Sequence, residues 1–194
     1  MSEIYLSLKN IEDLFQKLIV SMLGWDVSNP ILKNNVKIAW ATRPAWNPSD
    51  NIVFLKVVES DSMYNKEREV VNESIESPQE FVQKTSYTRQ IQVTLTVYGP
   101  NSFENMQIIR DSMFYQTFRN VLSKNKIYLI PDIPSPVRAP ELYNDQWWER
   151  VDMTLKFNEL IVRETSVVPV ESVDIIIYEG NEGKEIEEIN VSKN

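Results

Sequence analysis

Apolar residues recur at every third or fourth position between residues 8 and 23. The stripe consists of Ile11, Leu14, Phe15, Leu18, Ile19 and Met22. This spacing matches the 3.6-residue period of an α-helix with one buried face. Gly24 follows, and glycine commonly ends a helix. The polar face is not basic, so we expect a helix that packs on a core rather than one that lies on a membrane surface.

Two longer segments alternate apolar and polar residues with a period of two. In residues 85–98, one face carries Tyr87, Arg89, Ile91, Val93, Leu95 and Val97. In residues 146–159, one face carries Trp147, Val151, Met153, Leu155 and Phe157. The opposite faces are rich in Thr, Gln, Asp and Lys. The alternation predicts two strands, each with one face on the core and one in water or against a polar partner.

These two strands are long for a chain of this size. Fourteen extended residues span about 46 Å. A globule of 194 residues is only about 42 Å across. Two alternatives remain open. The strands protrude as a hairpin whose edges pair with another copy, or a bulge near Arg89 or Arg150 splits each strand.

Shorter elements complete the predicted fold. Apolar runs indicate strands at residues 36–42, 51–58, 127–130 and 172–178. Prolines make us expect an extended, unpaired segment over residues 131–142. A second helix starts after Asn101, an N-cap candidate with Glu104 three residues on, and ends near residues 123–125. The order of elements favours an α+β fold: a single mixed, mainly antiparallel sheet with two main helices packed on one face.

Two segments lack a clear pattern. Residues 59–80 are charged and hold few apolar residues, which predicts a protruding β-arm or long loop that orders alone or against a partner. Residues 179–194 contain five Glu and two Lys, which predicts an acidic, flexible C-terminal tail. We therefore expect a single domain over residues 1–178, followed by this tail.

The composition narrows the chemistry of the chain. It has no cysteine and no histidine, and its formal net charge is −8. Disulfides, Cys-based metal sites and most catalytic triads are thereby excluded, and the charge disfavours broad binding to phosphate backbones. No apolar run approaches the ~20 residues that span a bilayer. Because the N-terminus also lacks the features of a secretory signal, we expect no membrane contact and a cytoplasmic protein.

Catalytic motifs are missing as well. The sequence has no P-loop, dinucleotide-binding or nucleophile-elbow motif. Four carboxylates near the proline-rich segment could bind a hard cation: Asp132, Glu141, Asp145 and Glu149. Their spacing repeats no known cation site, so we expect surface charges and no cofactor. A carboxylate-dependent metal enzyme is kept only as a remote alternative.

Several short motifs occur in a fixed order. They are Pro44-Ala45-Trp46, residues 51–56, the run of residues 90–100 into the helix at 101–106, Gln146-Trp147-Trp148-Glu149-Arg150, residues 154–158 and residues 165–177. In this order they resemble the phage neck terminator family of tail-terminator proteins, over residues 36–178. The resemblance implies a tail-terminator-like fold and a structural virion protein, not an enzyme. Such proteins form a ring, usually of six copies, that caps the head-proximal end of the tail tube and ends tail growth.

The resemblance also implies partners and a location. The ring would lie at the tail–neck junction of a phage or of a phage-derived contractile particle, after assembly in the host cytoplasm. It would contact the tail tube protein, the sheath protein and the head–tail connector, and DNA would only pass through its lumen. The negative charge suits such a lumen because it repels phosphates. A head-side connector or stopper of the neck remains the alternative function.

Contact residues are predicted from residue type and expected exposure. Aromatic and arginine side chains are enriched at protein interfaces. The candidates are Trp46, Tyr64, Arg68, Arg89, Arg138 and Trp148. The alternation places Trp147 with the core residues and leaves Trp148 as the interface anchor, whereas the alternative for Trp46 is a loop folded onto the core.

Overall fold

The computed structural model divides the chain into two compact units. It describes residues 3–4, 6–25, 35–39, 46–47, 49–74, 81–167, 172–179 and 184–192. We call residues 4–69 and 86–162 the body. Residues 1–3, 70–85 and 163–194 are the extension. The two longest strands contribute residues to both units.

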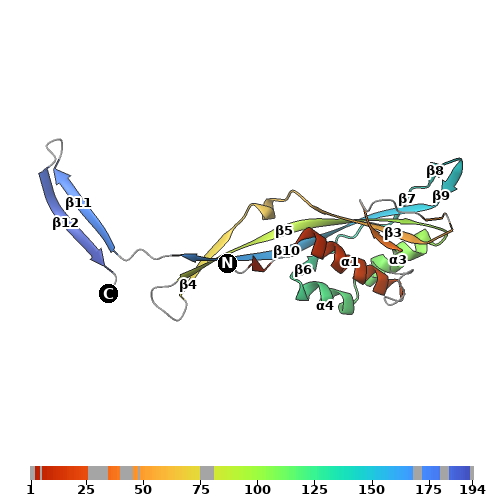
Figure 1. The fold of residues 1–194 in the computed structure, drawn as a ribbon, viewed down its shortest axis with the longest axis horizontal. Helices are drawn as coiled ribbons and strands as arrows, with labels where there is room; N and C mark the ends of the chain where they lie inside the picture. The colour runs from red at the N-terminus through yellow and green to blue at the C-terminus, as the bar shows by residue number, and fades with distance from the viewer. Residues whose placement is uncertain are drawn as a thin grey trace. The chain divides into compact units, whose positions relative to one another are not determined.

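One mixed sheet dominates the described residues (Figure 1). Its main path runs β1-β10-β5-β3-β2, with β4 also paired to β5, and β6 and β7 paired to β10. The strands are β1 (Glu3–Ile4), β2 (Val36–Ile38), β3 (Ile52–Glu59), β4 (Glu69–Ser74), β5 (Phe81–Tyr98), β6 (Ile127–Leu129), β7 (Val137–Arg138) and β10 (Arg150–Val167). β2 is parallel to β3, whereas β3 is antiparallel to β5, and β6 and β7 are antiparallel to β10.

In the part of the chain that the structure describes, three α-helices cover one face of this sheet. They are α1 (Leu8–Met22), α3 (Ser102–Ser112) and α4 (Gln116–Lys124), and Figure 1 shows them together on the same side of β10, β5 and β3. Two further two-stranded sheets pair β8 (Glu141–Tyr143) with β9 (Gln146–Trp148), and β11 (Ser172–Glu179) with β12 (Lys184–Ser192). The predicted α+β fold, with a mainly antiparallel sheet and helices on one face, is confirmed.

The core of the body consists of the alternating apolar residues predicted from the sequence. The inward residues of β5 and β10 are buried: Ile91, Val93, Leu95, Val97, Val151, Met153, Leu155 and Phe157. The apolar stripe of α1 packs onto them, with the rings of Phe15 and Phe157 4.8 Å apart. Full burial of each such side chain is worth about 1.5–3 kcal/mol, so this helix–sheet contact holds the body together.

The ends of α1 follow from its flanking residues. At the N-terminus, the Ser7 hydroxyl accepts a hydrogen bond from the Asn10 amide at 3.2 Å. At the C-terminus, Gly24 takes a φ of +65°. The Gly24 amide donates to the Ser21 carbonyl and the Trp25 amide donates to the Val20 carbonyl, which is the Schellman arrangement. The predicted end of the helix at Gly24 is confirmed.

The second predicted helix is divided into α3 and α4. Met113 and Leu122 are both almost completely buried. Nine residues of one straight helix rotate by about 180° relative to the starting side chain, so a single helix would place these two on opposite faces. The break at residues 113–115 allows both to face the core. Asn101 is the N-cap of α3, but its side chain makes no capping hydrogen bond, contrary to the capping box expected with Glu104.

The proline-rich segment is paired, so the prediction of an unpaired segment is wrong. Val137 and Arg138 lie opposite Asp152 and Val151 of β10, and β8 pairs with β9. A proline removes only its own amide hydrogen, and the residues between the prolines retain theirs. Ala139, for example, donates to the carbonyl of Arg150 at 2.9 Å.

The strand predicted at residues 146–159 is interrupted at Glu149, which separates β9 from β10. The predicted irregularity near Arg150 is therefore present. β5 runs from Phe81 to Tyr98 as one strand, without the irregularity considered near Arg89. Both strands are longer than predicted, since β10 extends to Val167.

Two segments without a clear sequence pattern contain regular structure. Residues 59–80 include a short 3₁₀ helix, η1 (Met63–Asn65), and β4, while residues 75–80 lie outside the described residues. Lys184–Ser192 form β12 and pair with β11, where the acidic composition predicts a flexible tail. The register places Ile189 opposite Ile175 and Val191 opposite Val173, so a short apolar alternation is present within the acidic segment. The strand predicted at residues 36–42 is described only as β2.

Gly99 provides a test of how β5 is joined to α3. Its φ is +110°, and a Cβ there would lie 2.4 Å from the Asp50 carbonyl oxygen. We expect Gly99→Ala to lower the free energy of unfolding by about 2 kcal/mol or more, since both backbone and neighbour must move. Urea denaturation measures this change.

The matched control is Gly24→Ala. Gly24 also has a positive φ, but a Cβ there would meet nothing within 4 Å. We expect a loss of only about 1 kcal/mol from the left-handed backbone alone. Equal losses for the two variants would contradict the steric account of Gly99.

Candidate functional site

Two of the predicted contact residues meet in one aromatic cluster of the body. The indole of Trp46 lies 4.9 Å from the Phe54 ring, 5.7 Å from Tyr98 and 5.8 Å from Trp148. Tyr143 adds a further edge contact to Trp148 at 6.2 Å. These distances are typical of favourable aromatic pairs. Trp46 and Trp148 are half-buried, so they hold a loop and the β8–β9 hairpin against the outer face of β3 and β5.

A polar network lies beside this cluster. The Tyr98 hydroxyl donates to Glu141 at 2.9 Å, and Arg150 forms ion pairs with Glu141 and Asp152 at 3.1 and 2.9 Å. Thr96 also donates to Asp152 at 2.8 Å. Burial and the hydrogen bond to Glu141 raise the pKa of Tyr98 to about 12. Hydrogen bonds to Asp152 raise the pKa of Arg150 above its ordinary value. The polar face of the strands is thus internally paired at this end.

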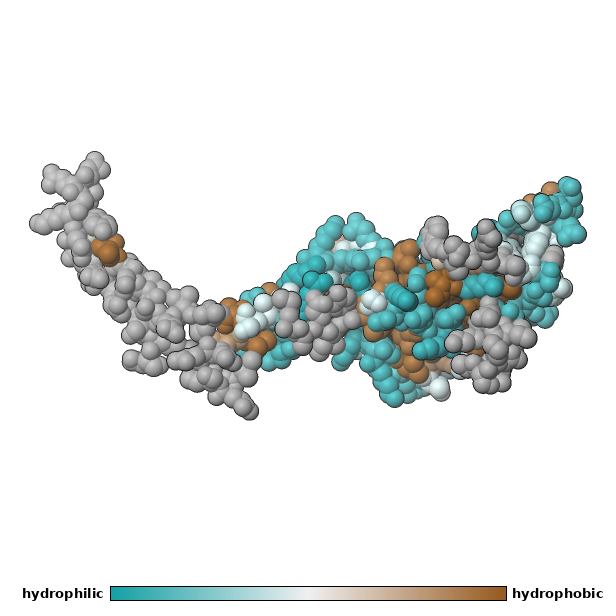
Figure 2. Space-filling model, viewed as in Figure 1, coloured by the Kyte–Doolittle hydropathy of each residue, from teal (hydrophilic) through white to brown (hydrophobic). Residues whose placement is uncertain are grey.

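The β8–β9 hairpin exposes apolar side chains at its surface. Asn144 and Asp145 both have positive φ, at 49° and 59°, which suits a tight two-residue turn. Leu142 and Trp147 lie opposite each other in the register and are 56% and 70% exposed. Val137 of β7 is 61% exposed. We call Val137, Leu142, Tyr143 and Trp147 the hairpin surface; Figure 2 shows the hairpin tip at the right-hand end of the described part.

The predicted roles of the two adjacent tryptophans are reversed. The sequence alternation placed Trp147 with the core residues, yet Trp147 is exposed and Trp148 contacts the aromatic cluster. β9 pairs with β8 in a separate two-stranded sheet and does not join the main sheet, so the helix-covered core does not extend to Trp147.

Tyr64 and Arg68 line a second surface, at the far end of the body segment of β5. The Arg68 guanidinium lies 3.7 Å from the centre of the Tyr87 ring, within cation–π distance. It also donates to the carbonyls of Asn65 and Glu67. An open hollow of about 460 Å³ is lined by Tyr64, Glu67, Arg68, Glu69, Ser86, Tyr87, Thr88 and Leu160. We call this the η1 hollow.

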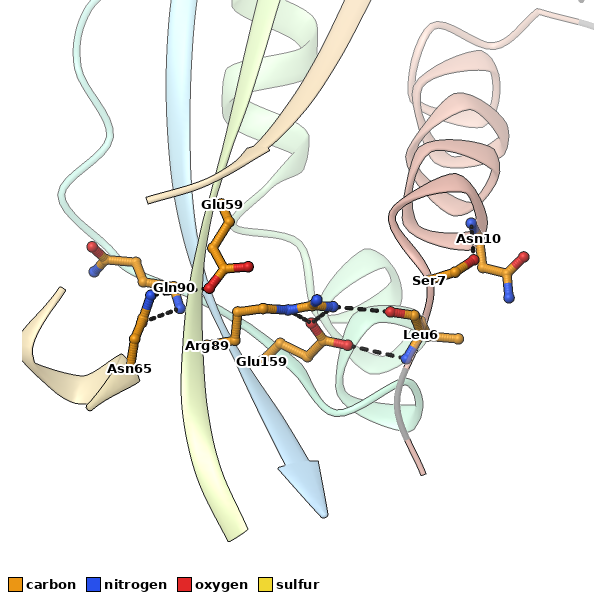
Figure 3. A network of polar contacts seen from close by, with 8 residues as sticks. All are labelled: Leu6, Ser7, Asn10, Glu59, Asn65, Arg89, Gln90 and Glu159. Carbon is orange, nitrogen blue, oxygen red and sulfur yellow. Dashed lines mark hydrogen bonds and ion pairs between the residues drawn. The ribbon is translucent and has the colours of Figure 1, made fainter. Parts of the chain in front are cut away.

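We predicted that Arg89 is exposed, and this is wrong because the side chain is buried. The side chain is in a buried network with Glu159, shown in Figure 3. Its Nε and Nη2 atoms donate to the same Glu159 oxygen at 2.8 and 2.6 Å, and Nη2 also donates to the Leu6 carbonyl at 2.9 Å. The other Glu159 oxygen accepts from the Leu6 amide at 3.3 Å. Arg89 therefore positions the residues that lead into α1.

Arg138 lies on β7 and is exposed. Its guanidinium forms an ion pair with Glu149 at 3.3 Å. The six predicted residues are therefore distributed over three places on the body surface and one in its interior. Sequence reasoning did not identify Trp147 and Leu142 as exposed residues, because their exposure follows from the pairing of β8 with β9 outside the main sheet.

The described residues contain no group of three or more Asp and Glu side chains arranged to hold a metal ion. Of the four carboxylates considered from the sequence, Glu141 is paired with Arg150 and Glu149 with Arg138. Within the same described ranges, no helix is both long and apolar enough to cross a bilayer.

The chain matches a known protein family. The family model described as phage neck terminator protein matches residues 9–184. No curated protein matches the chain. The match covers the body and most of the extension, and it agrees with the family predicted from the ordered sequence motifs.

The buried ion pair predicts a strong and asymmetric response to mutation. Arg89→Met leaves the Glu159 carboxylate buried without a cation, and we expect the free energy of unfolding to fall by about 3–5 kcal/mol. The double variant Arg89→Met, Glu159→Leu removes both charges and should lose less than the single variant. Chemical denaturation measures both.

The exposed pair supplies the control for that experiment. Arg138 and Glu149 also form an ion pair, but both side chains are more than half exposed. We expect Arg138→Met to change stability by less than about 1 kcal/mol. A double variant at Arg89 and Glu159 that is less stable than Arg89→Met would contradict the account of a buried, uncompensated charge.

The raised pKa of Tyr98 predicts that the free energy of unfolding falls in alkali. Its pKa in the folded chain is about 12, above the ordinary value of 10.0, so the folded state holds the phenol proton more tightly than the unfolded state. This contribution is complete below pH 10 and is lost as the pH rises towards 12. Tyr98→Phe should flatten the decline in unfolding free energy between about pH 10 and 12. Tyr115→Phe, at an exposed tyrosine, is the control, and identical declines in all three proteins would refute the assignment.

Proposed function

We propose that this chain, which belongs to the phage neck terminator family, forms a ring of six copies that caps the head-proximal end of a tail tube. The family match over residues 9–184 carries this proposal. Members of the family are structural proteins of the phage neck, and a neck terminator ends the tail. In the proposed ring, the copies stop further addition of tube subunits and present a surface to the head connector.

The body has two separate surfaces that are suited to partner proteins. The hairpin surface adjoins the aromatic cluster at Tyr98, whereas the η1 hollow contains Tyr87. These two tyrosines are eleven residues apart on one strand, or about 36 Å along β5. One body can therefore contact two partners at the same time.

The residue types at both surfaces support protein contacts. Tryptophan, tyrosine and arginine are enriched among the residues that contribute most to binding. The hairpin surface exposes Trp147 and Leu142, and the η1 hollow contains Tyr64 and Arg68. We assign the hairpin surface, with Arg138 at its base, to the tail tube protein. Trp46 and Trp148 support this surface from below.

The charge of the chain supports passage of DNA. With a net charge of −8 per copy, a ring of six is strongly acidic, and acidic residues that face the lumen would repel phosphates. In this proposal DNA passes through the ring without stable binding. The sheath protein and the head–tail connector are the further proposed neighbours in the virion.

The direct test is to add the purified chain to tail tube protein while the tube is polymerising. We expect tubes with a density at one end only, growth that stops when the chain is added, and six copies per capped tube by mass photometry. The double variant Leu142→Ala, Trp147→Ala should cap at least about tenfold less well. Leu8→Ala, at another exposed apolar residue, is the control. Tubes that grow equally in the presence of the chain would contradict the proposal.

A deletion in the parent phage separates the two candidate neck functions. Loss of a tail terminator should give free heads and overlong or uncapped tails. If instead the chain binds the portal assembly and tails of normal length accumulate, the head-side connector is the correct function. Normal virions without this chain would exclude both.

A further inference from the structure

α4 and β6 form a basic surface on an otherwise acidic chain. Residues 112–131 contain Arg119, Lys124 and Lys126 and no Asp or Glu, although the chain as a whole has 28 acidic residues. All three cations are exposed. We call these residues, together with Tyr115 and Tyr128, the α4 surface.

The cations of the α4 surface differ from the paired arginines of the sheet. Arg89, Arg138 and Arg150 each form an ion pair with a carboxylate. Among the ion pairs of the described residues, none includes Arg119, Lys124 or Lys126. The α4 surface is thus available to an acidic partner.

Apolar contact area accompanies this charge. Tyr115 and Tyr128 are 58% and 47% exposed. A hollow of about 180 Å³ lies between α4 and β6, lined by Gln116, Arg119, Leu122, Ser123, Ile127, Tyr128 and Leu129. A partner that suits this surface carries carboxylates and small branched apolar side chains together.

The β11–β12 hairpin has that composition. Its two strands contain five acidic residues and one lysine. The register pairs Val173 with Val191 and Ile175 with Ile189, and residues two apart on a strand share a face. β11 and β12 form a sheet of two strands. A hairpin of only two strands is marginally stable in water and gains stability when one face is covered.

We infer that the β11–β12 hairpin of one copy binds the α4 surface of a neighbouring copy. This inference rests on the proposed ring, in which every copy gives a hairpin to one neighbour and receives one from the other. Opposite charges favour the contact, whereas two acidic hairpins would repel each other. The contact joins two different surfaces, so it passes from copy to copy and closes with the ring.

Charge reversal on each side tests the contact. One variant carries Arg119→Glu and Lys124→Glu on α4, and the other carries Glu187→Lys and Glu188→Lys on β12. We expect each variant alone to self-associate at least about tenfold more weakly than the unmodified chain in sedimentation velocity. Lys9→Glu with Lys17→Glu, at exposed positions of α1, changes the charge equally and should leave assembly unchanged.

Mixing the two reversed variants gives the sharper result. Each hairpin then meets an α4 surface of opposite charge on the other variant, so an alternating ring should form. A chain with all four reversals should also recover assembly. If the single variants assemble normally, or if neither the mixture nor the fourfold variant recovers, the inference is overturned, and unaltered capping of tubes would leave the proposed function standing.

A disulfide experiment tests the contact without depending on the number of copies. Because the chain has no cysteine, Ser123→Cys in the hollow between α4 and β6 and Val191→Cys on β12 each introduce a unique thiol. Mixed under oxidising conditions, they should form a covalent pair between chains, and Ser7→Cys with Val191→Cys should not. Cross-linking without a six-copy ring would reject the ring and retain the contact. Binding of duplex DNA that requires Arg119 and Lys124 would assign the α4 surface to phosphates and overturn the inference.

Discussion

The ion pair of Arg89 and Glu159 joins the three parts of the body on which the rest depends. Arg89 is on β5, Glu159 is on β10, and both bind the backbone of Leu6, directly before the N-cap of α1. Burial of two charges is offset only when both find partners in good geometry. A shift of β5 against β10 by one residue would break this pairing and place the apolar face of one strand beside the polar face of the other. The pair therefore favours one register and fixes where α1 begins.

Arg89 also marks a boundary along β5. From Arg89 to Val97, alternate residues are buried, whereas the first eight residues of the strand are all half-buried. The helices cover the part of β5 from Arg89 to Val97, and their apolar stripes supply the core. β5 thus joins a helix-covered part of the sheet to a second part in which both faces are half-buried. This second part has the character of a surface that is completed by another molecule.

Charged and aromatic side chains gather in separate regions of the chain. The arginines of the body polar face are paired with nearby carboxylates, as Arg150 is with Asp152 and Arg138 with Glu149. Arg119, Lys124 and Lys126 are exposed and take part in none of the ion pairs of the described residues, while carboxylates are enriched in β11 and β12. Aromatic side chains concentrate near the β8–β9 hairpin. Such segregation of charge and apolar area in one chain suits a protein that assembles with copies of itself in a defined orientation.

The amino-acid sequence determined the elements whose pattern is local. The period of α1, its end at Gly24 and the core faces of β5 and β10 follow from apolar spacing, because burial requires one continuous stripe. The ordered motifs identified the family. Only the tertiary structure decided which tryptophan is exposed, that Arg89 is buried, and that residues 184–192 form a strand. Each of these depends on how elements pair in space: Trp147 on the pairing of β9 with β8, Arg89 on Glu159, and β12 on its register with β11. The composition of a segment does not contain that information, since a charge is buried only where folding brings its partner to it.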